Sequence, residues 1–418
     1  MSRPLPLLAL VLLTLAPHAR AADAVRTDLV VRTDFPGGSA EVQAIDQQAR
    51  SIKLLPTDHK GRGWRCWWHV RVSGITPGET LTLDVGDAPW ATPDRATYST
   101  DDGKTWRLTE PGKRAGKRIV YAVKVDAAEA QFAWGPPFTV ADAEALAKEV
   151  AAKVDGKDGV RAEAFELCKT REGRSTPAVR LTPPAKEGAA KDRAGPFGVF
   201  VCARQHAWES GGSWVGRGFA EFLASDDPAA RALRLKAAIV FVPVMDVDNV
   251  AIGAGGKNQD PHDHNRDWTD APVFPAVAAA QRLIKGMGAA GGFDLFLDLH
   301  NPAASDRRPF FFTGADELLN DQGKANRERF LQLAIDHVTG PLKLDPKPRP
   351  SGPAYDKLWR QISGNWVVAN TAPHVVGICL ETSWNTPDST TDGYRTVGRQ
   401  LGQAVAAYFE RDPRAARK

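Results

Sequence analysis

The sequence predicts an α/β protein in which a small antiparallel β-sandwich precedes a larger domain with a mixed, mainly parallel sheet covered by helices. In the first third of the chain, short runs rich in Val, Trp, Leu and Tyr alternate with turn signals. In the rest, apolar strand-like runs alternate with helical segments. The sequence pattern changes from short strand-like runs to alternating strand-like and helical segments near Pro136-Pro137. We therefore expect the sandwich to span residues 22–138 and the α/β domain residues 139–418.

The sandwich prediction depends on three strand-like runs, at residues 65–72, 80–85 and 118–125. Turn signals separate these runs. Asp102-Gly103, between Tyr98 and Trp106, is typical of a hairpin. Short strands at such spacing indicate a small sandwich. The many tryptophans of this region fit core packing better than a ligand platform.

The α/β prediction depends on five apolar runs, each of strand length, at residues 197–202, 238–244, 293–299, 309–312 and 375–380. Helical apolar spacing occurs between or beside them, at residues 140–154, 219–224, 276–285, 326–338 and 397–409. Alternation of this kind is typical of a mainly parallel sheet covered by helices.

The N-terminus has the layout of a secretory signal peptide. Arg3 precedes an apolar run over residues 5–16, and Ala19 and Ala21 give a cleavage pattern. The run is shorter than the ~20 residues of a membrane-spanning helix. We therefore expect residues 1–21 to be removed near Ala21 and the protein to be exported, to the periplasm or outside the cell, without a membrane anchor. The formal net charge of only +4 gives no case for nucleic-acid binding.

Four cysteines, Cys66, Cys168, Cys202 and Cys379, allow three disulfide pairings, and sequence does not choose among them. None has the spacing of a zinc knuckle. Cys202 and Cys379 lie in apolar runs, which favours buried free thiols, although export would leave disulfides open.

Two histidines and a glutamate form a candidate metal site. His206 and Glu209 follow the run over 197–202, and three residues apart they can reach one ion from a single turn. His300 ends the run over 293–299, at the sheet edge where α/β proteins bind ligands. Asp298 is a candidate to hydrogen-bond to the imidazole of His300 without binding the metal itself. Taken alone, His206 and Glu209 could be an ordinary surface pair. His300 alone could equally be a loop histidine without a metal.

A loop between these motifs contains His262, His264, Asn265 and Arg266. Arg266 can hold a carboxylate through two hydrogen bonds, and Asn265 can add an amide donor. The alternative is that Arg266 pairs with a neighbouring aspartate, Asp267 or Asp263, to order the loop. His262 and His264 are a rival metal pair, although a Gly-, Asn- and Asp-rich loop is a less favourable setting than a strand end.

Glu381 ends the apolar run over 375–380. Partial burial there would raise the pKa of this carboxyl and suit it to general-base work near neutral pH. A salt-bridge partner is the ordinary alternative for such a residue.

In this order, the motifs resemble the zinc metallocarboxypeptidases, the family of pancreatic carboxypeptidase A. The resemblance is strongest to the branch of the cytosolic carboxypeptidases, which trim glutamates and also have a β-sandwich before the catalytic domain. The matching segments are His206-Ala207-Trp208-Glu209 with Ser213-Trp214 and Gly218-Phe219, residues 243–249 leading to Asn265-Arg266, Asp298-Leu299-His300, and Leu380-Glu381-Thr382-Ser383.

The resemblance implies one zinc ion (Zn²⁺) per chain on His206, Glu209 and His300. It also implies hydrolysis of the C-terminal bond of peptides or proteins by a zinc-bound water, with Glu381 as general base. Asn265 and Arg266 would hold the free carboxylate of the substrate.

Two positions depart from the family pattern. The usual oxyanion arginine is replaced by Gly256-Lys257, where Lys257 can supply a less rigid positive charge. The mobile tyrosine of the family has three candidates, Tyr355, Trp359 and Trp366.

Two other functions stay open at this stage. The same chemistry could act on peptidoglycan stem peptides, or the fold could serve a non-catalytic binding protein. The presence of His206, Glu209, His300 and Glu381 weighs against the binding protein. The sequence has no G-x-S-x-G elbow and no H-E-x-x-H helix, so serine hydrolases and zincins have no support.

Overall fold

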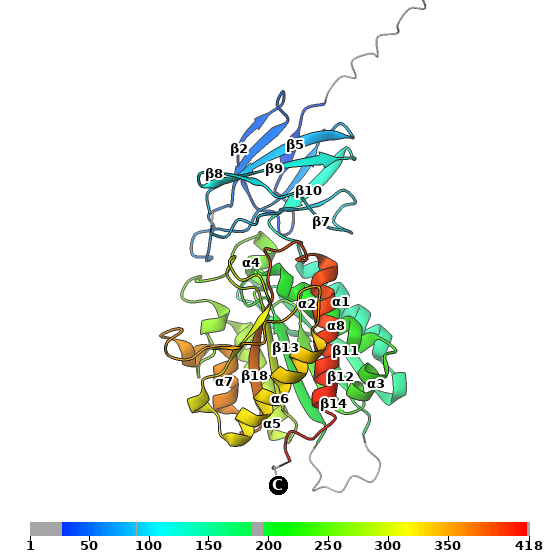
Figure 1. Ribbon diagram of the computed structural model, residues 1–418. Coiled ribbons are helices and arrows are strands. Elements are labelled where there is room, and N and C mark those ends of the chain that lie inside the picture. Colours follow the sequence, from blue (N-terminus) through cyan, green and yellow to red (C-terminus); the bar gives the residue numbers. More distant parts are fainter. Residues whose placement is uncertain (1–26, 89, 186–194, 416–418) are drawn as a thin grey trace, which may run out of the picture.

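Two small β-sheets stand at one end of the molecule, and a large mixed sheet with its helices forms the other end (Figure 1). The computed structural model describes residues 27–88, 90–185 and 195–415. Helices pack on both faces of the large sheet, which confirms the predicted fold class. Within these ranges, the helices all lack the length and apolar character that crossing a bilayer requires.

The small sheets share one core, to which both contribute buried side chains. The first sheet has the order β1 (Val30–Arg32), β4 (His69–Ser73), β10 (Glu129–Ala133), β6 (Thr97–Ser99) and β7 (Arg107–Leu108). The second has the order β2 (Glu41–Asp46), β3 (Ser51–Leu55), β5 (Glu79–Val85), β9 (Arg118–Val125) and β8 (Lys113–Ala115). Neighbouring strands are antiparallel, except that β3 and β5 run parallel.

The alternation of the sequence explains these strands. In β9, Ile119, Tyr121 and Val123 are buried while the residues between them are less so, because successive side chains point to opposite faces of a sheet. The hairpin predicted at Asp102-Gly103 is confirmed, since β6 pairs with β7 across that turn.

The large sheet has the order β11 (Arg161–Lys169), β12 (Ser175–Thr182), β14 (Ala237–Val242), β13 (Phe197–Ala203), β15 (Leu295–His300), β18 (Val376–Glu381), β16 (Phe310–Thr313) and β17 (Arg349–Pro350). Its centre, from β14 through β13 and β15 to β18, is parallel. The flanking pairs of β11 with β12, β12 with β14, and β16 with β18 are antiparallel. All five runs predicted as strands are strands, and the hairpin of β11 and β12 was not predicted.

The helices are α1 (Val140–Val154), α2 (Ser210–Ala224), α3 (Pro228–Arg234), α4 (Val247–Ile252), α5 (Pro275–Ala289), α6 (Asp321–His337), α7 (Ser363–Asn370) and α8 (Thr391–Tyr408). Buried side chains of α1, α2, α6 and α8 cover one face of the large sheet, and those of α5 and α7 cover the other. Thr139 caps α1 at its start, just after the predicted domain boundary. The division of the chain at residues 138 and 139 stays a prediction.

The two ends of the molecule are joined by an aromatic and polar interface. Trp134 of the N-terminal region lies against Trp384, with ring centroids 4.5 Å apart. Asp94 accepts hydrogen bonds from Arg307 and from the side-chain amide of Asn385. The parts are therefore held together by side chains far apart in the sequence.

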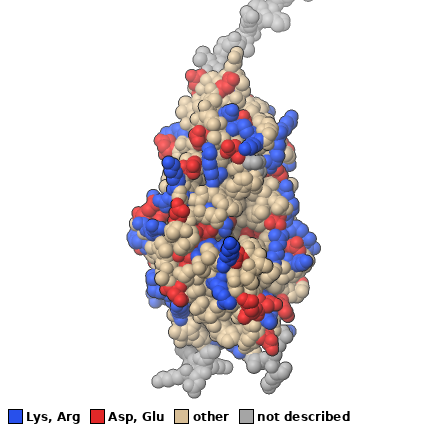
Figure 2. Space-filling view, turned by 90° about the vertical axis from the view of Figure 1, so that its left-hand side faces the viewer, with Lys and Arg blue, Asp and Glu red and all other residues tan. Residues whose placement is uncertain are grey.

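All four cysteines are free thiols, and Cys202 and Cys379 are buried as their apolar surroundings predicted. On the face shown in Figure 2, Lys and Arg side chains are interspersed with Asp and Glu. This mixture agrees with the small net charge.

Two glycines allow α2 and α8 to touch along their backbones. A Cβ on Gly398 would lie 1.9 Å from the carbonyl oxygen of Val215, and one on Gly218 would lie 2.0 Å from that of Arg395. A side chain therefore fits only if the helices separate. This contact matters for the site below, because α2 begins at Ser210, directly after Glu209.

We predict that Gly398→Ala lowers the free energy of unfolding by about 1–3 kcal/mol, the usual cost of overpacking a core. The matched control is Gly286→Ala in α5, where a Cβ would meet nothing within 4 Å. That change should stabilise the protein by about 0.5–1 kcal/mol through helix propensity. Urea unfolding measures both variants, and equal effects of the two changes would contradict the close contact.

Candidate metal centre and active-site cavity

Three parallel strands bring the candidate site residues to one edge of the large sheet. The loop after β13 contains His206 and Glu209, while His300 and Glu381 end β15 and β18. His300 and Glu381 are register partners across these two strands. Carboxyl ends of parallel strands share an edge, so this convergence follows from the topology.

His206, Glu209 and His300 form a buried cluster whose ligand atoms all lie within 4.8 Å of one another. The Nδ1 atom of His206 is 2.8 Å from Oε1 of Glu209, and the Nδ1 atom of His300 is 2.7 Å from Oε2. Both imidazoles thus present the same ring nitrogen to one carboxylate.

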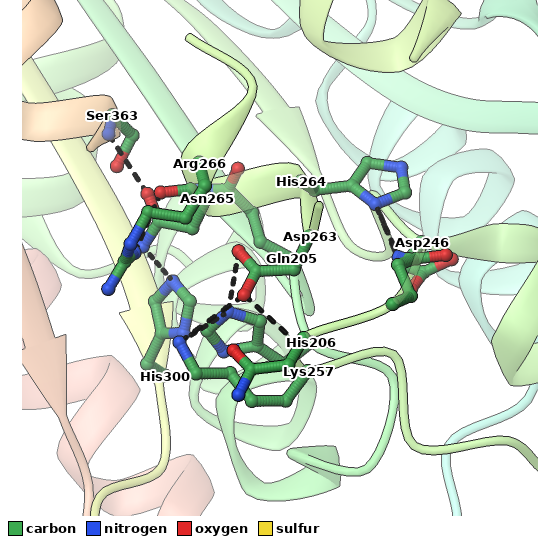
Figure 3. Close-up of polar contacts among 12 residues, drawn as sticks. Gln205, His206, Asp246, Lys257, Asp263, His264, Asn265, Arg266, His300 and Ser363 are labelled. Atoms are coloured by element: carbon green, nitrogen blue, oxygen red, sulfur yellow. Dashed lines mark hydrogen bonds and ion pairs between the residues drawn. The ribbon is translucent and has the colours of Figure 1, made fainter. Parts of the chain in front are cut away.

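The outer ring nitrogens contact carboxylates. Nε2 of His206 lies 3.3 Å from Asp263, and Nε2 of His300 lies 3.0 Å from Asp298 (Figure 3 shows His206, His300 and Asp263). Such partners fix ring orientation and tautomer in metal sites. Asp298 was predicted as this partner of His300, whereas Asp263 was considered only as a loop partner of Arg266.

The donor set fits a zinc ion. Zinc takes imidazole nitrogen and carboxylate oxygen, and catalytic sites commonly use three protein ligands. Burial by itself raises the pKa of Glu209, but the positive charges of His206 and His300 outweigh it and lower that pKa. The buried carboxylate therefore needs positive charge beside it, which a divalent cation supplies.

Glu381 lies in the same cavity, with one carboxylate oxygen, Oε2, that has no hydrogen-bond partner among the described residues. Burial raises the pKa of Glu381 to about 7. The Sγ atom of Cys379 lies 3.8 Å from Oε1 and donates to it. This carboxyl is accordingly available for proton transfer near neutral pH.

Lys257 reaches the cluster from a separate loop. Its Nζ atom is 3.4 Å from Nε2 of His206 and 3.4 Å from Oδ2 of Asp263. The N-terminal region holds this loop, because the backbone N–H of Trp64 donates to the carbonyl oxygen of Lys257 at 2.9 Å. The structure thus brings Lys257 beside the predicted metal ligands (Figure 3).

Arg266 and Asn265 line the cavity as well. Nε and Nη2 of Arg266 donate to Asp356 at 2.9 and 2.8 Å. The side-chain amide nitrogen of Asn265 lies 3.3 Å from Nε2 of His300, and its oxygen accepts from the backbone of Ser363. The carboxylate that pairs with the Arg266 side chain is therefore that of Asp356, not that of Asp263 or Asp267 as the alternative interpretation supposed.

The two histidines of the rival metal pair have other partners in the structure. His262 pairs with Asp267 at 2.6 Å. His264 is stacked on Phe274 with ring centroids 4.0 Å apart. Neither histidine belongs to a group of potential metal ligands in the described parts of the chain.

One cavity of about 690 Å³ contains the cluster, Glu381, Lys257 and Arg266. Its lining also includes the aromatic and aliphatic side chains Phe310, Phe312, Ile362 and Ile378, and the glycines Gly314, Gly364 and Gly377. Of the three candidates for the mobile tyrosine, Tyr355 lines the cavity, while Trp359 and Trp366 are buried outside its lining.

Sequence reasoning missed several residues at the site. Asp356 lies ninety positions beyond Arg266 in the chain, and no local pattern marks it. Trp64 and Trp90 were assigned to core packing, yet both line the cavity. Their only signal was the high tryptophan content of the N-terminal region.

Two family profiles match the chain. One described as zinc carboxypeptidase matches residues 148–310, and one described as cytosolic carboxypeptidase N-terminal domain matches residues 31–134. The first match contains His206, Glu209 and His300 and ends before Glu381.

Curated relatives and a solved structure agree with these profiles. Cytosolic carboxypeptidase 2 of Danio rerio is 28% identical over 171 residues, which cover 40% of this chain and 23% of that protein. Cytosolic carboxypeptidase 4 of Mus musculus is 30% identical over 188 residues, covering 43% and 16%. The chain therefore spans less than a quarter of the length of these relatives. A metallo-carboxypeptidase from Burkholderia cenocepacia shares the fold, with a TM-score of 0.76, 20% identity, and coverage of 92% of this chain and 99% of that one.

The predicted export is wrong. The matched relatives are named cytosolic carboxypeptidases, and the N-terminal profile carries the same description. The predicted signal peptide, residues 1–21, lies outside the described residues. A short apolar run followed by alanines also arises in ordinary Leu- and Ala-rich sequence, so this pattern alone does not specify export.

The matches cover both regions of the chain, and the fold and the His-Glu-His cluster agree with them. The chain therefore contains a zinc carboxypeptidase domain, preceded by a region that matches the N-terminal domain of the cytosolic carboxypeptidases.

Proposed function

We propose that this protein is a zinc-dependent carboxypeptidase that hydrolyses the C-terminal bond of peptides or proteins. One observation carries the proposal: a histidine–carboxylate–histidine cluster, a half-buried glutamate and an arginine line the same cavity. These groups supply a metal site, a proton acceptor and a carboxylate-binding cation.

Zinc would be held by Nδ1 of His206, Nδ1 of His300 and the carboxylate of Glu209. When bound, zinc supplies Lewis-acid chemistry, which lowers the pKa of a water molecule and polarises a carbonyl oxygen. Asp263 and Asp298 would keep the two imidazoles oriented from outside.

Glu381 would act as general base and then general acid. Its carboxylate takes a proton from the attacking water and passes it to the leaving amine. The free Oε2 atom suits this role, because no neighbouring donor among the described residues competes for it.

Arg266 would bind the terminal carboxylate of the substrate, with Asn265 beside it, and Lys257 would stabilise negative charge that develops on the carbonyl oxygen. Arg266 is already paired with Asp356 through one carboxylate oxygen, so a substrate carboxylate would share or displace this partner. The apolar cavity wall and its glycines leave room for the side chain of the last residue.

The peptidoglycan alternative was argued from export, and the correction of the location removes that argument. The non-catalytic alternative has no support from the site, because the candidate ligands and Glu381 all remain in place.

The first prediction concerns the metal. Purified protein should contain about one zinc per chain, and His206→Ala should remove most of it, because a ligand is lost. His262→Ala is the matched control and should keep the metal. Metal analysis by mass spectrometry measures both. Loss of zinc from the control but not from His206→Ala would mean that the ligands are assigned wrongly.

The second prediction separates chemistry from metal binding. Glu381→Gln should retain zinc and fold but lower kcat by at least ~10²–10⁴, the range of general-base catalysis. Glu163→Gln, on β11 at the far side of the sheet, is the control and should be neutral. Near-normal turnover by Glu381→Gln would refute the role.

The third prediction concerns Arg266. Wild type should prefer a peptide with a free C-terminus over the matching C-terminal amide. Arg266→Ala should reduce this preference at least about tenfold, because a hydrogen bond to a charged group contributes ~1.5–3 kcal/mol. Arg349→Ala removes another cavity arginine and should leave the preference unchanged. The measurement is kcat/KM for the peptide pair.

If Arg266 only orders the loop through Asp356, Arg266→Ala should lose thermal stability and keep the acid-to-amide preference. Equal cleavage of both peptides by wild type would contradict the carboxypeptidase proposal itself.

A further inference from the structure

Four tryptophans line the cavity, and the proposed chemistry uses none of them. Trp64 and Trp90 of the N-terminal region line it, beside Trp208 and Trp384. The rings of Trp64 and Trp90 meet edge to face with centroids 4.7 Å apart, and Trp64 lies 6.2 Å from Trp208. An aromatic wall therefore runs from the metal cluster to the N-terminal region.

Trp90 is unusually open for a tryptophan, with 51% of its surface exposed. Among the large hydrophobic side chains exposed in the described residues, Trp90 and Tyr355 are the aromatic ones, and both line this cavity. Trp90 is also absent from the buried core of the N-terminal region. Its ring therefore contributes more to the cavity than to the fold.

The order of contacts gives the direction in which a bound peptide would run. Asn265, next to Arg266, lies 3.3 Å from His300 on one side of the cluster. Lys257, whose carbonyl oxygen accepts from the backbone N–H of Trp64, lies 3.4 Å from His206, the other imidazole of the cluster. A peptide with its terminal carboxylate at Arg266 and its scissile carbonyl at the cluster would continue, toward its amino end, along the tryptophans.

We propose that Trp64 and Trp90 form a subsite for the residues on the amino side of the scissile bond and select an aromatic or large apolar side chain there. Aromatic rings bury much apolar area and gain further energy from edge-to-face contacts. The subsite rests on the proposed function, since it orients the substrate by the carboxylate at Arg266. It also gives the N-terminal region a part in substrate recognition.

The test uses a series of amino-blocked peptides with one C-terminal residue. A single Phe is moved through the positions before the scissile bond in an alanine background, and kcat/KM is compared with that of the all-alanine peptide. Wild type should favour Phe at its best position about tenfold, a gain typical of burying an aromatic ring. In Trp90→Ala, the ratio of kcat/KM for this Phe peptide to kcat/KM for the all-alanine peptide should fall close to one. Trp90→Phe should retain most of the preference for Phe.

The matched control is Trp106→Ala, which removes another tryptophan of the N-terminal region, one that lies against His69 and away from this cavity. It should keep the wild-type ratio. An unchanged ratio in Trp90→Ala, or no Phe preference at any position in wild type, overturns the subsite and leaves the proposed function standing. A wild-type protein that removes no C-terminal residue from any peptide overturns the proposed function and the subsite with it.

Discussion

A carboxylate buried between two imidazoles is the constraint on which the rest of this structure depends. Glu209 is only 3% exposed, and burying a charge is costly unless an opposite charge lies close to it. The flanking histidines are held in turn by Asp263 and Asp298. A divalent cation bound here would balance these charges and thereby stabilise the local fold.

The surrounding architecture keeps this cluster in place from two sides. The parallel centre of the large sheet places His300 and Glu381 side by side, and the glycine contact between α2 and α8 fixes the helix that starts after Glu209. From the other side, the N-terminal region binds the loop of Lys257 through backbone hydrogen bonds from Trp64 and to Arg62. Residues of both regions of the chain therefore line the candidate active-site cavity.

The sequence was sufficient for features that local patterns encode. Each strand of the parallel centre is a continuous apolar run, and His300 and Glu381 are recognisable because they end such runs. Contacts between distant loops were not predictable. Nothing near Arg266 indicates Asp356, and the composition around Trp90 fits a core tryptophan as well as a cavity wall. The export prediction failed because a short apolar N-terminus is not a specific signal.

Zinc-edge anomalous diffraction from crystals of the purified protein would show whether a metal occupies the cluster of His206, Glu209 and His300. We expect one strong peak within bonding distance of Nδ1 of His206, Nδ1 of His300 and the Glu209 carboxylate, at the ~2.0–2.2 Å typical of zinc ligands. A peak held by His262 or His264, or a cluster that stays metal-free in crystals soaked with zinc, would contradict it.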